Sequence, residues 1–474
     1  MDARPNILLL MTDQQRGDCL GVEGHPVLLT PTMDSIAGRG VRFTQAYSTC
    51  PSCVAARRSL LSGQFPATHG LVGYRDAVEW DAPTTLPAAL SRAGYQTCLV
   101  GRSMHQHPPR KRYGYEHMVL AGEDYDEWLR LHEPSGSAGY YGSGVMHNDW
   151  TARPWHMPEG MHQTNWVVNQ ALDFLRKRDP SCPFFLTVSF AAPHPPLVPP
   201  APYFERYLRQ ELPAPVIGDW AEPPANNGLG MGQAAGRVCL TGEALRSARA
   251  GYYALINHVD DQLNRLLNTV TGVNLKETVV VFTSDHGEML GDHYLWRKSL
   301  PYGPACRIPL LIRAPERFGL KAGATVDKPV CLEDIMPTLL EMAGVVVPAS
   351  VEGRSLAALG RGEAAPWRES LHIEHAPKFH ALTDGREKYV WFAADGREQL
   401  FDLAQDPSEI HDLAARPEQA ARLARWREQM ARILAGRPEG FSEGGKLIPG
   451  RPYAAAMPHA GRPDPSWTGR TCRT

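Results

Sequence analysis

The chain has 474 residues, of which 43% are hydrophobic and 21% charged, a composition typical of a folded protein and too apolar for a disordered one. Its 49 Lys and Arg against 51 Asp and Glu give a net charge of -2, so the chain has no overall basic field to attract nucleic acid or an anionic membrane. The apolar runs are far shorter than the roughly 18 residues of a membrane span. We therefore expect neither nucleic acid nor a membrane as a partner.

The cysteines and the first residues bear on the compartment. Nine cysteines are an odd number for a disulfide framework in a long chain, which favours reduced thiols. The opening MDARPNILLLM enters an apolar run without the charged region, long apolar stretch and cleavage site of an export signal. These features predict a cytoplasmic protein.

Short apolar runs alternate with helical patterns through the first half of the chain, which is typical of crossover units in a mostly parallel sheet. In chain order, we expect strands at residues 6–11, 41–43, 96–100, 184–190, 279–282 and 307–310. Helices are expected at residues 31–38, 85–93, 164–177 and 243–270, with Thr30 and Thr85 as the first two N-caps. The predicted fold class is α/β, with a large mixed, mostly parallel sheet sandwiched by helices.

Two long segments interrupt this alternation. Residues 106–158 are rich in Gly, Tyr, Trp and His, and residues 192–236 are rich in Pro and Gly. We expect both to be long irregular insertions. Insertions of this length are often lids or substrate loops, and surface decoration is the alternative.

The pattern changes after Pro366. Short β-rich runs at residues 372–374, 381–383, 389–392 and 399–401 are separated by Asp-Gly turns, which predicts an antiparallel meander. A helix is expected at residues 417–434, followed by a Pro- and Gly-rich tail. The sequence thus predicts a large α/β domain at 1–366 and a smaller C-terminal subdomain at 367–474, with an antiparallel sheet packed by a helix and an extended tail.

Polar residues follow two of the predicted parallel strands. Asp13 and Gln14 come after the first strand, and Asp285 and His286 after a later one. Carboxyl ends of parallel strands converge on the crevice where open α/β sheets bind ligands. Two carboxylates, an amide oxygen and an imidazole are a plausible oxygen-rich site for a divalent cation.

A second cluster contains Cys50, Cys53 and Arg57. Cys50 and Cys53 could form a redox or metal-binding pair, although the chain offers no second Cys pair for zinc. Alternatively, Cys53 opens a short helix whose N-terminus favours an anion, with the guanidinium of Arg57 one turn further on.

The run Cys53-x-Ala55-x-Arg57, followed by Leu60-Leu61-Ser62-Gly63, resembles the signature of the type I sulfatases of the alkaline phosphatase superfamily. It departs from the family pattern at Ala55, where proline is usual, and at Ser62, where threonine is usual. The resemblance implies that a formylglycine-generating enzyme converts Cys53 to formylglycine, whose hydrated aldehyde is the nucleophile. It also implies a divalent metal, Ca²⁺ or alternatively Mn²⁺, held by Asp13, Gln14, Cys53, Asp285 and His286.

Further motifs of the family occur in the same order along the chain. Lys298 matches the sulfate-holding lysine, His194 the histidine beside the leaving group, and Arg102 and His105 a G-K-x-H segment that here reads Gly-Arg-Ser-Met-His. Arg57, Arg102 and Lys298 are then expected to neutralise the sulfuryl oxygens. His194 is expected to protonate the leaving alcohol, and His105 to accept a proton when sulfate is expelled.

The sequence therefore predicts a sulfuric ester hydrolase that attacks a sulfate monoester in line, on a small sulfated saccharide or an aryl alcohol. Two alternatives stay open. A phosphonate monoester or phosphodiester hydrolase of the same superfamily would share this metal shell, and a catalytically silent protein would bind a sulfated ligand without turnover. Assembly into a homo-oligomer is also open.

Overall fold

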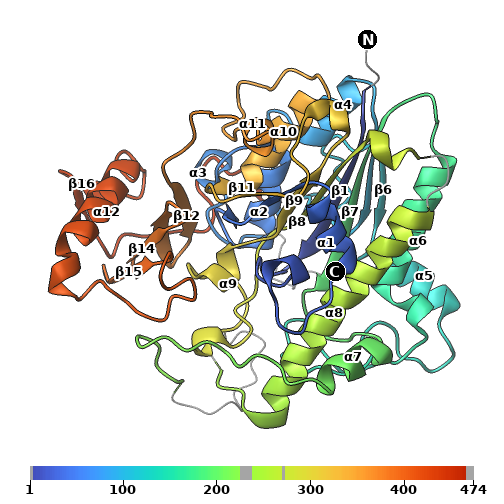
Figure 1. Ribbon diagram of the computed structural model, residues 1–474, viewed down its shortest axis with the longest axis horizontal. Coiled ribbons are helices and arrows are strands. Elements are labelled where there is room, and N and C mark those ends of the chain that lie inside the picture. The colour runs from blue at the N-terminus through green and yellow to red at the C-terminus, as the bar shows by residue number, and fades with distance from the viewer. Residues whose placement is uncertain (1–3, 225–237, 270–272, 466–474) are drawn as a thin grey trace.

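The computed structural model describes residues 4–224, 238–269 and 273–465 (Figure 1). Among these residues an eight-stranded sheet forms the centre, in the order β10-β2-β9-β8-β1-β7-β5-β6. In that order the strands are β10 Ala324–Val326, β2 Val41–Phe43, β9 Leu310–Arg313, β8 Thr278–Ser284, β1 Asn6–Asp13, β7 Phe184–Pro193, β5 Gln96–Gly101 and β6 His117–Leu120. β9 runs antiparallel to both neighbours, whereas the remaining described pairings in this sheet are parallel. The prediction of a mixed, mostly parallel sheet is confirmed.

Helices cover both faces of the sheet because its strands are apolar on both faces. In β1, Leu8 and Leu10 belong to one hydrophobic core, and Ile7, Leu9 and Met11 to another, as the two-residue period of a strand requires. The first core also contains side chains of α1 Pro31–Gly38, α6 Gln163–Lys177 and α8 Gly242–Thr269. The second contains side chains of α2 Cys53–Ser62, α4 Leu86–Arg92 and α10 Ile335–Met342 (Figure 1).

The two predicted N-caps have different outcomes. Thr85 caps α4 as predicted, because its side chain accepts a hydrogen bond from the first turn of the helix. Thr30 precedes α1, but its side chain makes no capping bond. Asp260 of α8 caps this helix instead, accepting hydrogen bonds from the backbone N–H groups of Thr32 at 3.0 Å and Met33 at 2.8 Å.

The first predicted insertion, residues 106–158, is not wholly irregular. It supplies the edge strand β6 and the helix α5 Asp124–His132. The strand was not visible in the sequence because an edge strand is short and partly solvated: His117 is exposed, and Met118 and Val119 are only partly buried. The prediction of a purely irregular segment was therefore wrong for this part.

The second predicted insertion, residues 192–236, also contains a helix, α7 Ala201–Leu208, and its residues 225–236 lie outside the described part of the chain. The strand predicted at residues 307–310 begins only at Leu310. Pro309 has no backbone N–H to donate to a neighbouring strand, which explains the later start.

The predicted meander forms a separate antiparallel sheet (Figure 1). Its strands are β12 Leu371–His375, β13 Phe379–Thr383, β14 Glu387–Phe392 and β15 Glu398–Asp402. The predicted helix at residues 417–434 starts as a 3₁₀ turn, η7 Pro417–Gln419, and continues as α12 Ala420–Ile433, which packs on one face of this sheet. The other face packs on the part of the chain that contains the eight-stranded sheet, through side chains that include Tyr47 and Tyr302.

The C-terminal tail returns to the first part of the chain. Its strand β18 Arg462–Pro463 pairs with β4 Val78–Glu79, and Met457 N–H donates to the carbonyl of Gly70 at 2.8 Å. The remaining strands are β3 Ala46–Tyr47, β11 Val330–Cys331, β16 Ser442–Glu443 and β17 Lys446–Leu447. The remaining helices and 3₁₀ turns are α3 Pro66–His69, α9 Gly303–Cys306, α11 Ala357–Gly360, η1 Gly21–Glu23, η2 Glu159–Met161, η3 Leu275–Glu277, η4 Asp292–Tyr294, η5 Glu316–Phe318 and η6 Leu332–Asp334. Within the described ranges, no helix combines the length and apolarity needed to cross a bilayer.

Candidate active site

Asp13 and Asp285 lie side by side at the carboxyl ends of two neighbouring strands. β1 and β8 pair in parallel, with Thr12 opposite Ser284. Asp13 and Asp285, which follow these two residues, therefore enter the same crevice. The backbone N–H of Gln14 donates to Oδ1 of Asp285 at 3.1 Å, and both carboxylates are fully buried. The parallel register thus brings together two carboxylates that are distant in sequence.

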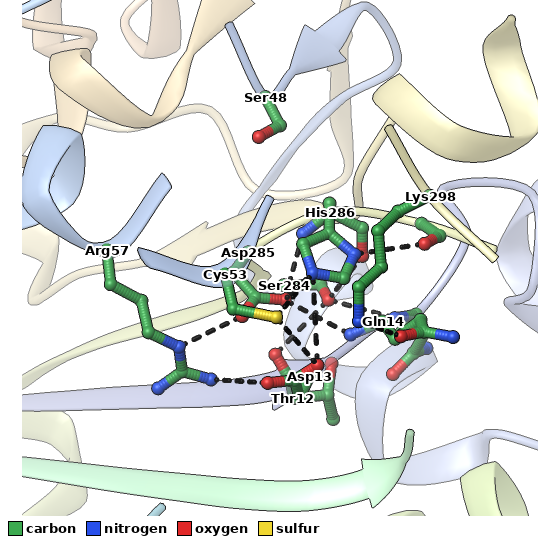
Figure 2. A network of polar contacts seen from close by, with 12 residues as sticks. Thr12, Asp13, Gln14, Ser48, Cys53, Arg57, Ser284, Asp285, His286 and Lys298 are labelled. Carbon is green, nitrogen blue, oxygen red and sulfur yellow. Dashed lines mark hydrogen bonds and ion pairs between the residues drawn. The ribbon is translucent and has the colours of Figure 1, made fainter. Parts of the chain in front are cut away.

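The thiol of Cys53, the first residue of α2, points at these carboxylates (Figure 2). Its Sγ lies 3.1 Å from Nε2 of His286 and 3.9 Å from Oδ1 of Asp13. Nδ1–H of His286 donates to the carbonyl of Gly287 at 3.0 Å, which turns Nε2 toward the thiol. The potential ligand atoms of Asp13, Cys53, Asp285 and His286 all lie within 4.8 Å of one another.

Gln14, the fifth predicted ligand, adjoins this cluster. Its amide oxygen accepts a hydrogen bond of 2.6 Å from Nζ of Lys298, and its amide nitrogen donates to Glu288. The side chain of Gln14 therefore connects Lys298 to Glu288, while its backbone N–H binds Asp285 of the metal-ligand cluster. Its backbone has a positive φ of 71°, a left-handed conformation that non-glycine residues adopt mainly where the surroundings impose it.

The loop before Cys53 is held from both sides. The carbonyl of Pro51 accepts a hydrogen bond from the N–H of Ser299 at 3.0 Å, and the carbonyl of Thr49 accepts one from the N–H of Glu374 at 2.8 Å. The first donor adjoins Lys298 and the second belongs to β12 of the C-terminal sheet. The loop is buried, so these bonds fix the start of α2 within the interior.

Arg57 binds the carboxylates and has no exposed surface (Figure 2). Its Nε donates to Asp285 at 2.9 Å and its Nη2 to Asp13 at 3.1 Å, while Nη1 donates to the carbonyl of Ser103 and to the hydroxyl of Ser189, both at 3.0 Å. These donors therefore fix the two carboxylates. The expected contact of Arg57 with sulfuryl oxygens stays a prediction.

The charged groups shift one another's pKa values. Burial raises the pKa of Asp13, but Arg102, His194 and Arg57 outweigh it and hold this pKa well below its ordinary value. Burial and the charge of Asp13 raise the pKa of Asp285. These opposite directions are typical of two carboxylates that share one site.

The pKa of Cys53 is well below that of an ordinary thiol. Burial and Asp13 raise this pKa, but Lys298, His286 and a hydrogen bond with His105 outweigh them. Burial lowers the pKa of His286, and the charges of Asp285 and Cys53 reverse that direction. The site therefore favours an anionic group at position 53.

The remaining predicted residues surround the cluster. Nε of Arg102 lies 2.5 Å from Oδ2 of Asp13, and His105 is hydrogen-bonded to Cys53. Nδ1–H of His194 donates to the carbonyl of Pro195 at 2.6 Å, and its ring lies close enough to Asp13 to lower the pKa of that carboxyl. The structure thus brings the predicted site residues into one assembly, which is buried except that His105 and Lys298 are partly exposed.

Sequence reasoning missed His147. This residue lies in the insertion 106–158, and its ring stacks on that of His194 at a centroid distance of 4.7 Å and an interplanar angle of 22°. The length of the insertion was the available signal that it contributes to the site. Spacing in the sequence does not show which of its residues reaches the site.

Cys50 does not join this assembly. Its side chain is fully buried in a small apolar cluster with Val54, Ala55 and Leu71. Burial raises the pKa of its thiol well above the ordinary value, in the opposite direction to Cys53. The geometry therefore gives no support to a redox pair of Cys50 and Cys53.

A model of the sulfatase family matches residues 5–345, which is well over half of the chain. The chain belongs to the sulfatase family. It is thus a sulfuric ester hydrolase of the alkaline phosphatase superfamily. A second model, of the C-terminal part of N-sulphoglucosamine sulphohydrolase, matches residues 291–435.

Curated and solved relatives span nearly the whole chain of this sulfatase family member. An arylsulfatase of Clostridium perfringens is 39% identical, covering 95% of this chain and 98% of the relative. A choline-sulfatase of Rhizobium meliloti is 30% identical, covering 86% and 82%. The crystal structure of a phosphonate monoester hydrolase of Agrobacterium radiobacter superposes with a TM-score of 0.78 at 27% identity, covering 91% and 96%.

The donor set fits the metal on which this family depends. Two carboxylates, an imidazole nitrogen and residue 53 converge in a site where each side chain is buried. Buried carboxylates are stable in proteins when a cation or hydrogen-bond donors compensate their charge. A divalent cation with oxygen-rich coordination would satisfy this arrangement.

Proposed function

We propose that the protein hydrolyses the sulfate monoester of a small saccharide or an aryl alcohol, with formylglycine at position 53 as the nucleophile and Ca²⁺ as the metal. Mn²⁺ is the alternative cation. The observation that carries this proposal is the position of Cys53, whose Sγ lies 3.1 Å from Nε2 of His286 within a four-residue ligand cluster. The Cys53 thiol stands in here for the hydroxyl of the hydrated aldehyde.

Asp13, Gln14, Asp285 and His286 would hold the cation together with residue 53. When bound, a divalent cation lowers the pKa of the nucleophilic hydroxyl and neutralises charge on a sulfuryl oxygen. Arg57 keeps the two carboxylates in place for this purpose.

Lys298 and Arg102 supply the positive charge for the remaining sulfuryl oxygens. Nζ of Lys298 is held by Gln14 at 2.6 Å, and Nε of Arg102 by Asp13 at 2.5 Å. Both cations are thus fixed before the substrate arrives. Fixed charges need little reorganisation during the reaction, which makes their stabilisation of developing charge effective.

His194 is the acid for the leaving alcohol. Burial and Lys298 lower its pKa well below the ordinary value, so its ring is neutral before the substrate binds. A bound sulfate ester brings negative charge beside the ring, which raises the pKa and favours uptake of the proton that the alkoxide needs. His105, hydrogen-bonded to position 53, is placed to accept a proton from the second hydroxyl when sulfate is released.

The decisive experiment combines mass spectrometry with turnover. The peptide containing Cys53 is measured from protein made together with a formylglycine-generating enzyme, and the same protein is assayed on 4-nitrophenyl sulfate with Ca²⁺. We expect the peptide mass to fall by the difference between a CH₂SH and a CHO side chain. We also expect hydrolysis of 4-nitrophenyl sulfate, and we expect Cys53→Ala to abolish it. An unmodified cysteine in an active enzyme would refute formylglycine as the nucleophile.

Phosphonate monoester hydrolysis is the second candidate, because a hydrolase of that class superposes on this chain with a TM-score of 0.78. Matched aryl sulfate, aryl phosphonate and aryl phosphodiester substrates separate the two. A higher kcat/KM on the sulfate supports the main proposal, whereas a preference for the phosphonate would replace it.

We also propose a cytoplasmic location. Eight of the nine cysteines lie in the described part of the chain, and all eight are free thiols there. Free thiols are typical of a reducing compartment. Localisation of the tagged protein by cell fractionation tests this proposal, and recovery from an oxidising compartment would contradict it.

A further inference from the structure

A segment of the first insertion is fastened to both sides of the site. On one side, Nη2 of Arg297 donates to the carbonyl of Asn148 at 2.5 Å, and its guanidinium lies 4.9 Å from the ring centroid of Trp150. On the other side, the N–H of Arg153 donates to the carbonyl of Leu197 at 3.1 Å. These anchors adjoin Lys298 and the stretch after His194 respectively. The segment between them is therefore held across the site.

His147 lies within this fastened segment and faces the charged groups of the site. The charged groups that act on its ring are Arg102, Lys298, Asp13 and Cys53. Its Nδ1 is buried and has no hydrogen-bond partner among the described residues. A buried ring nitrogen without a protein partner, directed among the groups of an active site, indicates a contact that a ligand completes.

The stacked arrangement places His147 on the side of the leaving group. His194 is fixed by the hydrogen bond from its Nδ1 to the carbonyl of Pro195, and the ring of His147 covers it at 4.7 Å. The charges of Lys298, Asp13 and Cys53 act on the same ring, so His147 lies beside the metal-ligand cluster at which a bound ester is attacked.

We propose that His147 is a substrate-binding residue that donates a ring N–H to a sulfuryl oxygen of the bound ester. The proposal rests on the sulfatase function proposed above and adds a contact to the same site. The sulfuryl group of a sulfate monoester has no proton to donate, so it can only accept hydrogen bonds. His147 therefore contributes as a neutral donor, beside the cationic donors Lys298 and Arg102.

The ionisation of His147 agrees with this role. Burial, Arg102 and Lys298 lower the pKa of its imidazole to about 4, so the ring is neutral at pH 7. A neutral imidazole carries one N–H donor, which is the group the contact needs. Proton transfer to the leaving alkoxide stays with His194.

Two substitutions separate hydrogen bonding from ring packing. His147→Asn keeps a donor and removes the ring, whereas His147→Phe keeps a ring over His194 and removes the donor. Because a hydrogen bond to a charged group is removed, we expect His147→Phe to lose about 10- to 100-fold in kcat/KM. We expect a smaller loss for His147→Asn. Retained activity in His147→Phe with loss in His147→Asn would assign His147 a packing role and overturn the proposal.

The dependence on the leaving group distinguishes His147 from His194. A nitrophenolate leaves without protonation, whereas a simple alkoxide needs a proton. We expect His147→Phe to lose the same factor on 4-nitrophenyl sulfate and on an alkyl sulfate, because the sulfuryl group is common to both. His194→Ala should lose far more on the alkyl sulfate. A leaving-group dependence of His147→Phe equal to that of His194→Ala would overturn the contact to a sulfuryl oxygen.

Binding of inorganic sulfate supplies a readout that does not require turnover. Calorimetry on the Ca²⁺-loaded protein should show weaker sulfate binding in His147→Phe by about tenfold or more, and smaller weakening in His147→Asn. His156→Phe is the matched control, since His156 is an exposed histidine of the same insertion. Equal sulfate affinity of wild type and His147→Phe, or no sulfate binding by the wild type, overturns the inference. A wild type that binds sulfate but cleaves no sulfate ester refutes the proposed function instead.

Discussion

Arg57 and Asp13 form an ion pair in which neither side chain has any exposed surface, with Nη2 and Oδ2 3.1 Å apart. The same guanidinium binds Asp285 through Nε at 2.9 Å. Buried ion pairs owe little to their Coulomb attraction alone, because desolvation of both groups opposes it. The value of this arrangement lies in geometry: one planar group fixes the spacing of two carboxylates that bind the same cation.

Arg57→Met should therefore damage both stability and metal binding. Two buried carboxylates then lose their compensating charge, which for a broken buried pair costs about 3–5 kcal/mol of unfolding free energy. We expect the loss of unfolding free energy in the presence of a chelator. We also expect calorimetry to show a large loss of Ca²⁺ affinity. Arg58→Met is the control, because Arg58 is also buried but donates to the carbonyls of Val78 and Ala460 and packs on Trp80, away from the two carboxylates. Ca²⁺ affinity of wild-type strength in Arg57→Met would contradict the positioning role.

Removal of the metal should lower the thermal stability of the protein reversibly. A ligand that binds only the folded state adds about 2.7 kcal/mol at a concentration of 100 times its Kd. Addition of Ca²⁺ after chelation should raise Tm in the wild type and in Asp395→Asn, a change on an exposed turn. Asp285→Asn should show no such rise. An equal rise in that variant would place the cation elsewhere.

Acid should destabilise the protein partly through His69. Its Nδ1 accepts from the N–H of Leu71 and its Nε2–H donates to Ser59, and burial lowers its pKa to about 3. The unfolded chain, with a histidine pKa near 6.5, binds the proton first, so stability is lost as the pH falls below about 6.5. At pH 5 this loss is about 2 kcal/mol.

Urea unfolding at pH 5 and pH 8 measures this contribution. His69→Gln does not titrate, so we expect a smaller difference between the two pH values than in the wild type. His132→Gln, at an exposed position on α5, should behave as the wild type does. The same difference in unfolding free energy in all three proteins would show that His69 does not contribute to the pH dependence of stability.

Cys50→Ser and Cys53→Ser should have different effects. Cys50 lies in an apolar cluster, so its replacement buries a hydroxyl at a cost of about 1–3 kcal/mol of unfolding free energy and leaves kcat on 4-nitrophenyl sulfate unchanged. Cys53→Ser removes the group that the maturation enzyme converts, and should abolish turnover. Equal loss of turnover in the two variants would restore the redox-pair interpretation.

Local signals in the sequence predicted much of the framework. The continuous apolar run of β1 predicts a buried strand, and Thr85 as an N-cap predicts the start of α4; both are confirmed. The edge strand β6 carries no such signal, because His117 is exposed and its pattern is that of a loop. Asp260, which caps α1, lies 228 residues from Thr32, and no local pattern connects them.

The candidate site shows the same limit. Sequence motifs identified Asp13, Cys53 and Asp285 as site residues. In the structure they lie together, with Asp13 and Asp285 brought side by side by the parallel register of β1 and β8. The orientation of Arg57 depends on Asp285, 228 positions further along the chain, so its role could not be predicted from the spacing. The position of His147 depends on how Arg297 anchors a long insertion, which is equally invisible in the sequence.

The two hydrogen bonds that hold the loop before Cys53 impose an order of events on the synthesis of the protein. Their donors, Ser299 and Glu374, leave the ribosome more than two hundred residues after the loop itself. Once both bonds form, Cys53 is only 2% exposed and out of reach of another enzyme. The proposed oxidation of Cys53 must therefore occur before folding buries this residue. Chains that fold first would accumulate as a stable but inactive population.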